Sequence, residues 1–319
     1  MKTLIIAEKP ELGRAIAAAL KATEREQQGV IRKGDLTITW AYGHLLRLKE
    51  PEEYDPKYKQ WKKEDLPIVF KDWQLVPDGD KAKRVAQIGE LIQQADQIIH
   101  AGDPDDEGQY LIDEILDYHH CDKPIKRLYI NDNTPELILR SIKEMKENDE
   151  ACKLAGRSAY ARAVADYVVG INYTRLFSVS LRKKAMSVGR VQSPTLGLIV
   201  ARDLQIEKHQ KQVYYELEVE VSVNQKSIKM KYKPSKAVLN DEKYILDKSL
   251  LEELQEQLKK AVLKIKIEQK EISQRPPLPY NLAKLQAAMN VKYGYDLSRT
   301  DRITQTLRDR YQAITYNRS

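Results

Sequence analysis

Short apolar runs alternate with stretches of helical periodicity along the first half of the chain. Residues 4–7 and 98–99 are apolar runs typical of buried strands, whereas apolar residues elsewhere recur every three or four positions, which indicates amphipathic helices. The predicted elements are strands at 4–7, 98–99 and 125–130, and helices at 11–20, 81–95, 135–145 and one that ends near residue 119. Strands that alternate with helices predict a mainly parallel, doubly wound sheet, and we place this α/β domain in residues 1–150.

Other patterns predict smaller elements. The turn residues 33–35 predict a hairpin or meander over 30–46, and 49–80 reads as an ordered loop with one strand near 73–76. The second half is helical from 151 to 209, with an interruption at 188–194. Strands are then expected at 212–223, 227–232 and 262–269, a charged helix at 250–258, a rigid linker at 274–279, and helices at 281–293 and 298–307. Thr134 and Ser298 are the expected amino caps of the helices that follow them.

Three carboxylates follow the buried strand at 98–99. Asp103, Asp105 and Glu107 lie in a Gly- and Pro-containing turn, and Glu8 follows the first strand. Because open α/β sheets place ligands at the carboxyl ends of their strands, we expect these four side chains to face one cleft if the two strands are neighbours. Crowded carboxylates favour a compensating cation, and hard oxygen ligands suit Mg²⁺. The alternative is a solvated acidic turn at a helix amino terminus.

The charge of the chain is unevenly distributed. Residues 1–150 carry 23 Lys and Arg against 30 Asp and Glu, whereas residues 151–319 carry 31 against 17. No acidic residue occurs between Asp166 and Asp203, where six Lys and Arg are found. Such a field attracts polyanions, with nucleic acid as the strongest candidate and a solvated basic face or an anionic membrane contact as alternatives.

Composition narrows the class further. No apolar run approaches membrane-spanning length, and the first apolar run is too short for a secretory signal, so we expect no membrane association. With only Cys121 and Cys152, neither a disulfide framework nor a Cys₄ zinc site can form, which fits a reducing cytoplasm.

Four motifs together carry a resemblance. IAEKP (6–10), AGDPDDEG (101–108), SVGRVQSP (187–194) and ITYNRS (314–319) resemble the type IA DNA topoisomerases, most closely the topoisomerase III branch, in the family's order. The acidic turn alone resembles the Toprim motif, which primases and some nucleases share. The resemblance implies a Toprim metal-binding domain (1–150), a helical DNA-binding segment (151–210), a β-rich arch segment (211–273) and the start of the tyrosine domain (274–319), as parts of a toroid that is incomplete at the C-terminus.

The resemblance also implies a mechanism. Tyr316 is the expected nucleophile, which cuts one DNA strand through a 5′-phosphotyrosyl bond and releases a 3′-hydroxyl. Arg318 matches the arginine that supports the tyrosine and the phosphate, and Lys9 the cation or proton donor at the leaving oxygen. Glu8, Asp103, Asp105 and Glu107 match the acidic set that holds Mg²⁺. The phosphodiester exchange conserves bond energy, so no ATP is expected, and no Walker-type loop is apparent.

DNA contacts are expected in the basic stretch of the second half. Arg190, Gln192 and Ser193 fall on the GRVQS motif, with Arg175, Arg182 and Lys183 upstream. The resemblance implies single-stranded and negatively supercoiled DNA as substrates, relaxation and decatenation as activities, a helicase as a partner, and a cytoplasmic location at the nucleoid. The alternative for the motif is a loop with a solvated Arg190.

Two departures qualify the resemblance. The family pattern has an aromatic–acidic pair after residue 307, where this chain has Arg308 and Asp309. The chain also stops three residues after Tyr316, so we expect a truncated form with impaired strand passage. The alternatives are a Toprim primase or nuclease, and a non-catalytic single-stranded DNA-binding protein.

Overall fold

A six-stranded sheet forms the centre of the first 150 residues. The computed structural model describes residues 1–22, 24–223, 225–241, 243–261 and 268–316. The strands run in the order β2-β3-β1-β6-β7-β8, with parallel pairing from β3 to β7 and antiparallel pairing at both edges. Their bounds are β1 Thr3–Ala7, β2 Val30–Lys33, β3 Leu36–Trp40, β6 Gln97–Ala101, β7 Ile125–Arg127 and β8 Lys146–Glu147. The predicted mainly parallel sheet is confirmed, with β7 shorter than expected.

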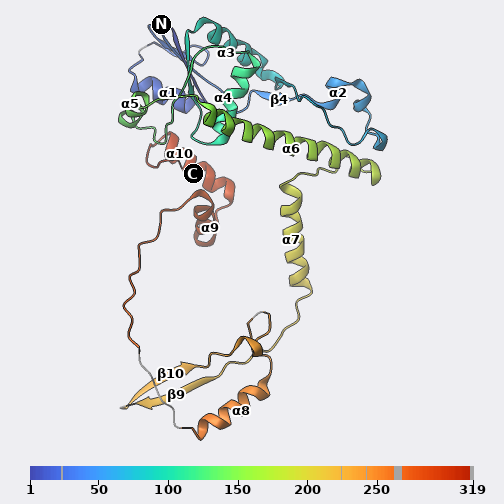
Figure 1. Cartoon of the computed structure of the whole chain (residues 1–319), viewed down its shortest axis with the longest axis vertical. Helices are drawn as coiled ribbons and strands as arrows, with labels where there is room; N and C mark the ends of the chain where they lie inside the picture. The colour runs from blue at the N-terminus through green and yellow to red at the C-terminus, as the bar shows by residue number, and fades with distance from the viewer. Residues whose placement is uncertain (23, 224, 242, 262–267, 317–319) are drawn as a thin grey trace. The chain divides into compact units, whose positions relative to one another are not determined.

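Helices cover both faces of this sheet (Figure 1). Side chains alternate along the central strands, so that Leu4 and Ile6 pack with one helical layer while Ile5 and Ala7 pack with the other. The first layer contains α3 (Ala82–Gln94) and α4 (Asp106–Tyr118), and the second contains α1 (Pro10–Ala19) and α5 (Pro135–Lys143). Two-sided burial explains why these strands read as continuous apolar runs.

The segment between β3 and α3 is ordered around aromatic side chains. Strand β4 (Leu46–Leu48) pairs with β5 (Leu75–Pro77), and α2 (Pro51–Tyr54) with two short 3-10 turns, Pro56–Lys59 and Lys63–Asp65, lies between them. Tyr54 stacks on Phe70 at 4.0 Å between ring centroids, and Trp73 packs against Tyr167 of α6. These rings therefore pack against one another within the protein.

The helix α6 (Glu150–Ser180) runs along α4. A Cβ on Gly156 would lie 2.5 Å from Asp113 Oδ2, at the end of a side chain of α4, so the two helices approach closely at this point. The chain divides into two compact units, residues 1–194 with 278–319, and residues 195–277. The larger unit also contains α9 (Leu282–Tyr293) and α10 (Leu297–Asp309).

The smaller unit contains a β-hairpin and a helix. Strands β9 (Glu218–Val223) and β10 (Lys226–Lys231) pair antiparallel, and α8 is Lys248–Lys259. The strand predicted at 212–223 is wrong in its first half, because its partner ends where Lys231 pairs with Glu218. The strand predicted at 262–269 lies mostly outside the described residues. Helix α7 (Gln192–Glu207) begins at the end of residues 1–194 and lies in the smaller unit from Thr195 onward.

One predicted cap is confirmed in its position and the other is wrong. Thr134 occupies the N-cap position of α5, although its side chain makes no cap hydrogen bond. Helix α10 begins before Ser298, and its cap is Asp296, whose carboxylate accepts a hydrogen bond from Arg299 N at 2.6 Å. An ionised carboxylate is the stronger acceptor at a helix amino terminus, since it also interacts with the helix dipole. No helix in the described part of the chain is long and apolar enough to cross a membrane.

Candidate active site

Two neighbouring strands position the first of the predicted carboxylates. Strands β1 and β6 are parallel, and Ala7 pairs with Ala101, so the residues that follow them emerge at one edge of the sheet. Asp103 N donates to Glu8 Oε2 at 2.8 Å. Burial and the repulsion of Asp103 raise the pKa of Glu8. Of the four carboxylates expected to face one cleft, Glu8 and Asp103 line the same cavity.

Two glycines allow the acidic turn to fold tightly. A Cβ on Gly102 would lie 2.0 Å from Gly108 O, and one on Gly108 would lie 2.5 Å from Asp103 O. Asp105 caps α4, because its Oδ1 accepts from Gly108 N at 2.7 Å. The turn is therefore held between the end of β6 and the first turn of α4.

Arg127 lies beneath the turn and was not singled out from the sequence. Its side chain is fully buried, and its guanidinium donates to Gly102 O, Asp103 O and Leu128 O and to Gln109 Oε1, each at 2.8 Å. A planar guanidinium suits this role because it presents five donors in fixed directions. An arginine in an apolar strand was the available signal, since such a residue is buried only when its donors are satisfied.

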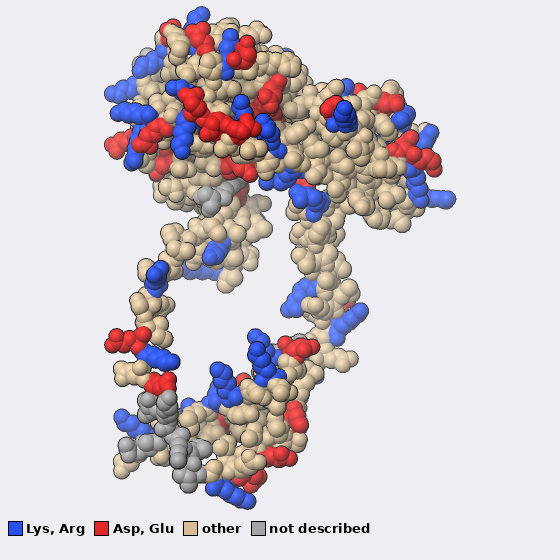
Figure 2. Space-filling model, in the orientation of Figure 1, with Lys and Arg blue, Asp and Glu red and all other residues tan. Residues whose placement is uncertain are grey.

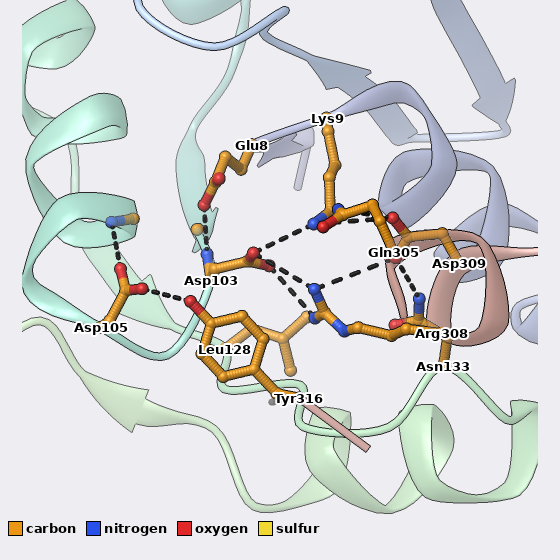
Figure 3. A network of polar contacts seen from close by, with 12 residues as sticks. Glu8, Lys9, Asp103, Asp105, Leu128, Asn133, Gln305, Arg308, Asp309 and Tyr316 are labelled. Atoms are coloured by element: carbon orange, nitrogen blue, oxygen red, sulfur yellow. Dashed lines mark hydrogen bonds and ion pairs between the residues drawn. The ribbon is translucent and has the colours of Figure 1, made fainter. Parts of the chain in front are cut away.

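Two cations neutralise Asp103 (Figure 3). Lys9 Nζ lies 3.1 Å from Asp103 Oδ2, and Arg308 of α10 donates to both carboxylate oxygens at 3.2 Å. Burial pushes the pKa of Asp103 upward, but the charges of Lys9 and Arg308 outweigh burial and lower that pKa overall. Asp103 is thus ionised and fully engaged by side chains of the protein.

Tyr316 lies at the same site. Its side chain is buried, its backbone N donates to Asn131 O at 3.0 Å, and its hydroxyl donates to Asp105 Oδ2 (Figure 3). Burial and the hydrogen bond to Asp105 raise the pKa of the phenol, so the hydroxyl is protonated at neutral pH. Arg318 lies outside the described residues.

Glu107 contacts different side chains from those that the other three carboxylates contact. Its oxygens contact His44 Nε2 at 3.1 Å and Arg162 Nη2 at 2.5 Å. His44 Nδ1 also lies 3.1 Å from the buried Glu114, and its contacts with Glu114 and Glu107 raise the pKa of His44 to about 9. Within the residues that the structure describes, no group of three or more His, Cys, Asp or Glu is arranged as a metal site.

A cavity of about 540 Å³ opens between the acidic turn and α10. Glu8, Lys9 and Asp103 line one side and Tyr316 another. The side from α10 is polar and consists of Ser298, Asp301, Arg302, Gln305 and Thr306. A polar cavity next to a phenol, an ammonium group and carboxylates can accommodate a phosphodiester.

The expected DNA-binding residues differ in their surroundings. Arg190 is exposed and pairs with Asp166 at 2.5 Å, and Arg182 and Lys183 are exposed at the end of α6. Gln192 Nε2 donates to Ser187 Oγ, and Ser193 Oγ accepts from Gly189 N, so both organise the GRVQS loop.

Arg175, by contrast, is buried. It pairs with Glu52 at 3.1 Å and donates to Tyr58 O at 2.6 Å, so in this arrangement its charge is used inside the protein. On the face that Figure 2 shows, basic and acidic side chains are interspersed over the larger unit. The basic excess of the second half therefore does not gather there into one patch.

Comparisons with known proteins show which families the chain resembles. A Toprim domain model matches residues 3–133, and a DNA topoisomerase model matches residues 153–319. The chain is 37% identical to DNA topoisomerase 3 of Vibrio cholerae and 38% identical to that of Haemophilus influenzae. These matches cover 100% and 99% of this chain and 52% of each relative, so the chain spans about half the length of the curated relatives it matches.

The fold also resembles a solved structure. Full-length topoisomerase I from Thermotoga maritima matches with a TM-score of 0.59 and 23% identity, over 96% of this chain and 46% of that one. The chain belongs to the DNA topoisomerase family, in the type IA branch that its motifs resemble.

Proposed function

We propose that this chain carries the strand-cleavage centre of a type IA topoisomerase. The observation that carries the proposal is the hydrogen bond from the Tyr316 hydroxyl to Asp105, beside a cavity that Tyr316 and Lys9 both line. Reactive groups from residues 9, 105 and 316 lie together at this site. A tyrosine with a purely structural role would not need a carboxylate and an ammonium group beside it.

The reaction is a transesterification. The Tyr316 oxygen attacks the scissile phosphorus and forms a 5′-phosphotyrosyl bond, while the bond between phosphorus and the 3′ oxygen breaks. Asp105 is within reach to accept the phenol proton, and the Lys9 ammonium donates a proton to the departing 3′ oxygen. Religation reverses these transfers. Because one phosphodiester replaces another, the cycle needs no nucleotide cofactor.

The carboxylates fit a magnesium ion chemically. Glu8, Asp103 and Asp105 offer hard oxygen donors. Burial and then repulsion by Asp103 raise the pKa of Glu8, and a bound cation would offset both effects. Bound Mg²⁺ would supply positive charge that orients the phosphate and the 3′-hydroxyl. Glu107 can join this set only if it leaves His44 and Arg162. Arg318, by its place in the motif, is proposed to hold the phosphate.

Single-stranded DNA is the proposed substrate of this centre. Arg182, Lys183, Arg190, Gln192 and Ser193 are proposed to contact its backbone, because they lie on an exposed, non-acidic segment. For a protein that contains this chain we propose relaxation of negatively supercoiled DNA and decatenation, at the nucleoid, with a helicase as the class of partner that supplies single strands.

A trapping assay tests the proposal. An end-labelled single-stranded oligonucleotide is incubated with the chain and Mg²⁺, quenched with detergent and separated on a denaturing gel. We expect a covalent adduct that Tyr316→Phe abolishes and that Tyr311→Phe, at an exposed tyrosine five residues away, retains. Cleavage without an adduct, unaffected by Tyr316→Phe, would instead indicate a Toprim nuclease.

A further inference from the structure

Arg308 is a buried cation at the centre of the site. Only 2% of the residue is exposed, and both of its terminal nitrogens donate to Asp103, Nη1 to Oδ2 and Nη2 to Oδ1. Its guanidinium carbon also lies 4.6 Å from the centre of the Tyr316 ring. One side chain therefore contacts both a carboxylate proposed to bind metal and the proposed nucleophile.

Ion pairs link Arg308 to three other charged side chains around it (Figure 3). Asp309 Oδ1 lies 3.9 Å from Arg308 Nη1, and Asp309 Oδ2 lies 3.8 Å from Lys9 Nζ. Lys9 in turn contacts Asp103, which Arg308 holds. Two cations thus alternate with two carboxylates, and both oxygens of Asp103 already have cationic donors.

This arrangement depends on the guanidinium group of Arg308. An aromatic ring at position 308 could pack on Tyr316, but it could not donate two hydrogen bonds to Asp103. In addition, Arg308 Nε is a buried donor without a hydrogen-bond partner among the described residues. Such a donor costs free energy unless a bound group satisfies it.

We propose that Arg308 is a resident counter-cation of Asp103 and a positioning residue for Tyr316, so that a divalent cation reaches Asp103 only in competition with it. The inference rests on the proposed function, because it concerns the same site. The competition follows from charge: a divalent ion beside the guanidinium is repelled, and Asp103 must release one cation to bind the other. By linkage, removal of Arg308 strengthens metal binding.

Metal binding without DNA tests this proposal. Mn²⁺ alone is titrated into the chain and free Mn²⁺ is measured by electron paramagnetic resonance. We expect Arg308→Gln to bind Mn²⁺ about tenfold tighter than the unmodified chain. Arg310→Gln removes the same charge from an exposed position two residues away and should change the affinity less than about twofold.

The direction of the change separates positioning from structural damage. A variant that merely disturbs the fold binds Mn²⁺ more weakly, whereas the proposal requires tighter binding. Arg308→Tyr, which also removes the positive charge, must also bind more tightly, and it replaces Arg308→Gln if that variant fails to fold by circular dichroism. Unchanged or weaker binding by a folded variant would overturn the proposal.

The outcome is independent of the adduct assay. If Tyr316 forms an adduct but the affinity for Mn²⁺ does not rise in the variants, the role of Arg308 is wrong and the proposed function stands. If the affinity rises but no adduct forms, the cleavage function fails and the competition at Asp103 stands.

Discussion

The acidic turn should depend on Arg127 for its stability. In Arg127→Met, Gly102 O, Leu128 O and Gln109 Oε1 each lose a donor at 2.8 Å, whereas Asp103 O keeps its bond from Asp105 N. An unsatisfied buried acceptor costs about 1–3 kcal/mol. Three unsatisfied acceptors would lower the free energy of unfolding by at least about 3 kcal/mol. We expect a loss near this lower limit, because the change also removes the desolvation cost of the buried guanidinium.

Tryptophan fluorescence can measure this loss in the larger unit alone. All three tryptophans, Trp40, Trp61 and Trp73, lie in residues 1–194, and Trp40 is fully buried. Urea unfolding followed by this signal gives the free energy of unfolding of that unit. Lys126→Met is the matched control, because its ammonium is partly exposed and lies 4.0 Å from Glu147, and we expect a change below about 0.5 kcal/mol. A loss for Arg127→Met no larger than that for the control would refute the reasoning.

Two further predictions concern the same turn. Burial lowers the pKa of His100 below its ordinary 6.5, so the neutral ring stabilises the fold above pH 6.5 and this contribution falls as the pH drops below 6.5. Urea unfolding from pH 7.5 to 5 should show this loss of stability. An equal dependence of the free energy of unfolding on pH in His100→Gln would contradict the prediction. Gly108→Ala places a methyl group 2.5 Å from Asp103 O and should weaken Mn²⁺ binding about 10- to 100-fold. The control Gly197→Ala, whose added methyl group has nothing within 4 Å, should leave the affinity for Mn²⁺ unchanged. Equal affinities of the two variants in a titration would show that the turn tolerates the methyl group.

The sheet, and the approach of Glu8 to Asp103 at its edge, could be predicted from the sequence for a physical reason. Apolar runs separated by amphipathic helices specify parallel strands, and parallel neighbours bring Glu8 and Asp103 to one edge. The position of Tyr316 was expected only from the family resemblance, since no periodicity relates it to residues 211 positions earlier.

The contacts that the sequence did not predict are long-range and side-chain specific. Arg308 reaches Asp103 across 205 residues, and Glu107 turns to His44, which lies 63 residues before it. Such pairs depend on how α10 and the loop after β3 pack, which local patterns do not encode. The strand at 212–223 failed for a similar reason, because the length of its partner set its extent.

The most direct test of the account is the location of the covalent bond. The trapped adduct is digested with nuclease and trypsin, and the peptide 311–318, which contains both Tyr311 and Tyr316, is fragmented in a mass spectrometer. The account predicts one added nucleotide, bound through its 5′ phosphate, on Tyr316. Nucleotide mass on Tyr311 or on another residue would contradict it.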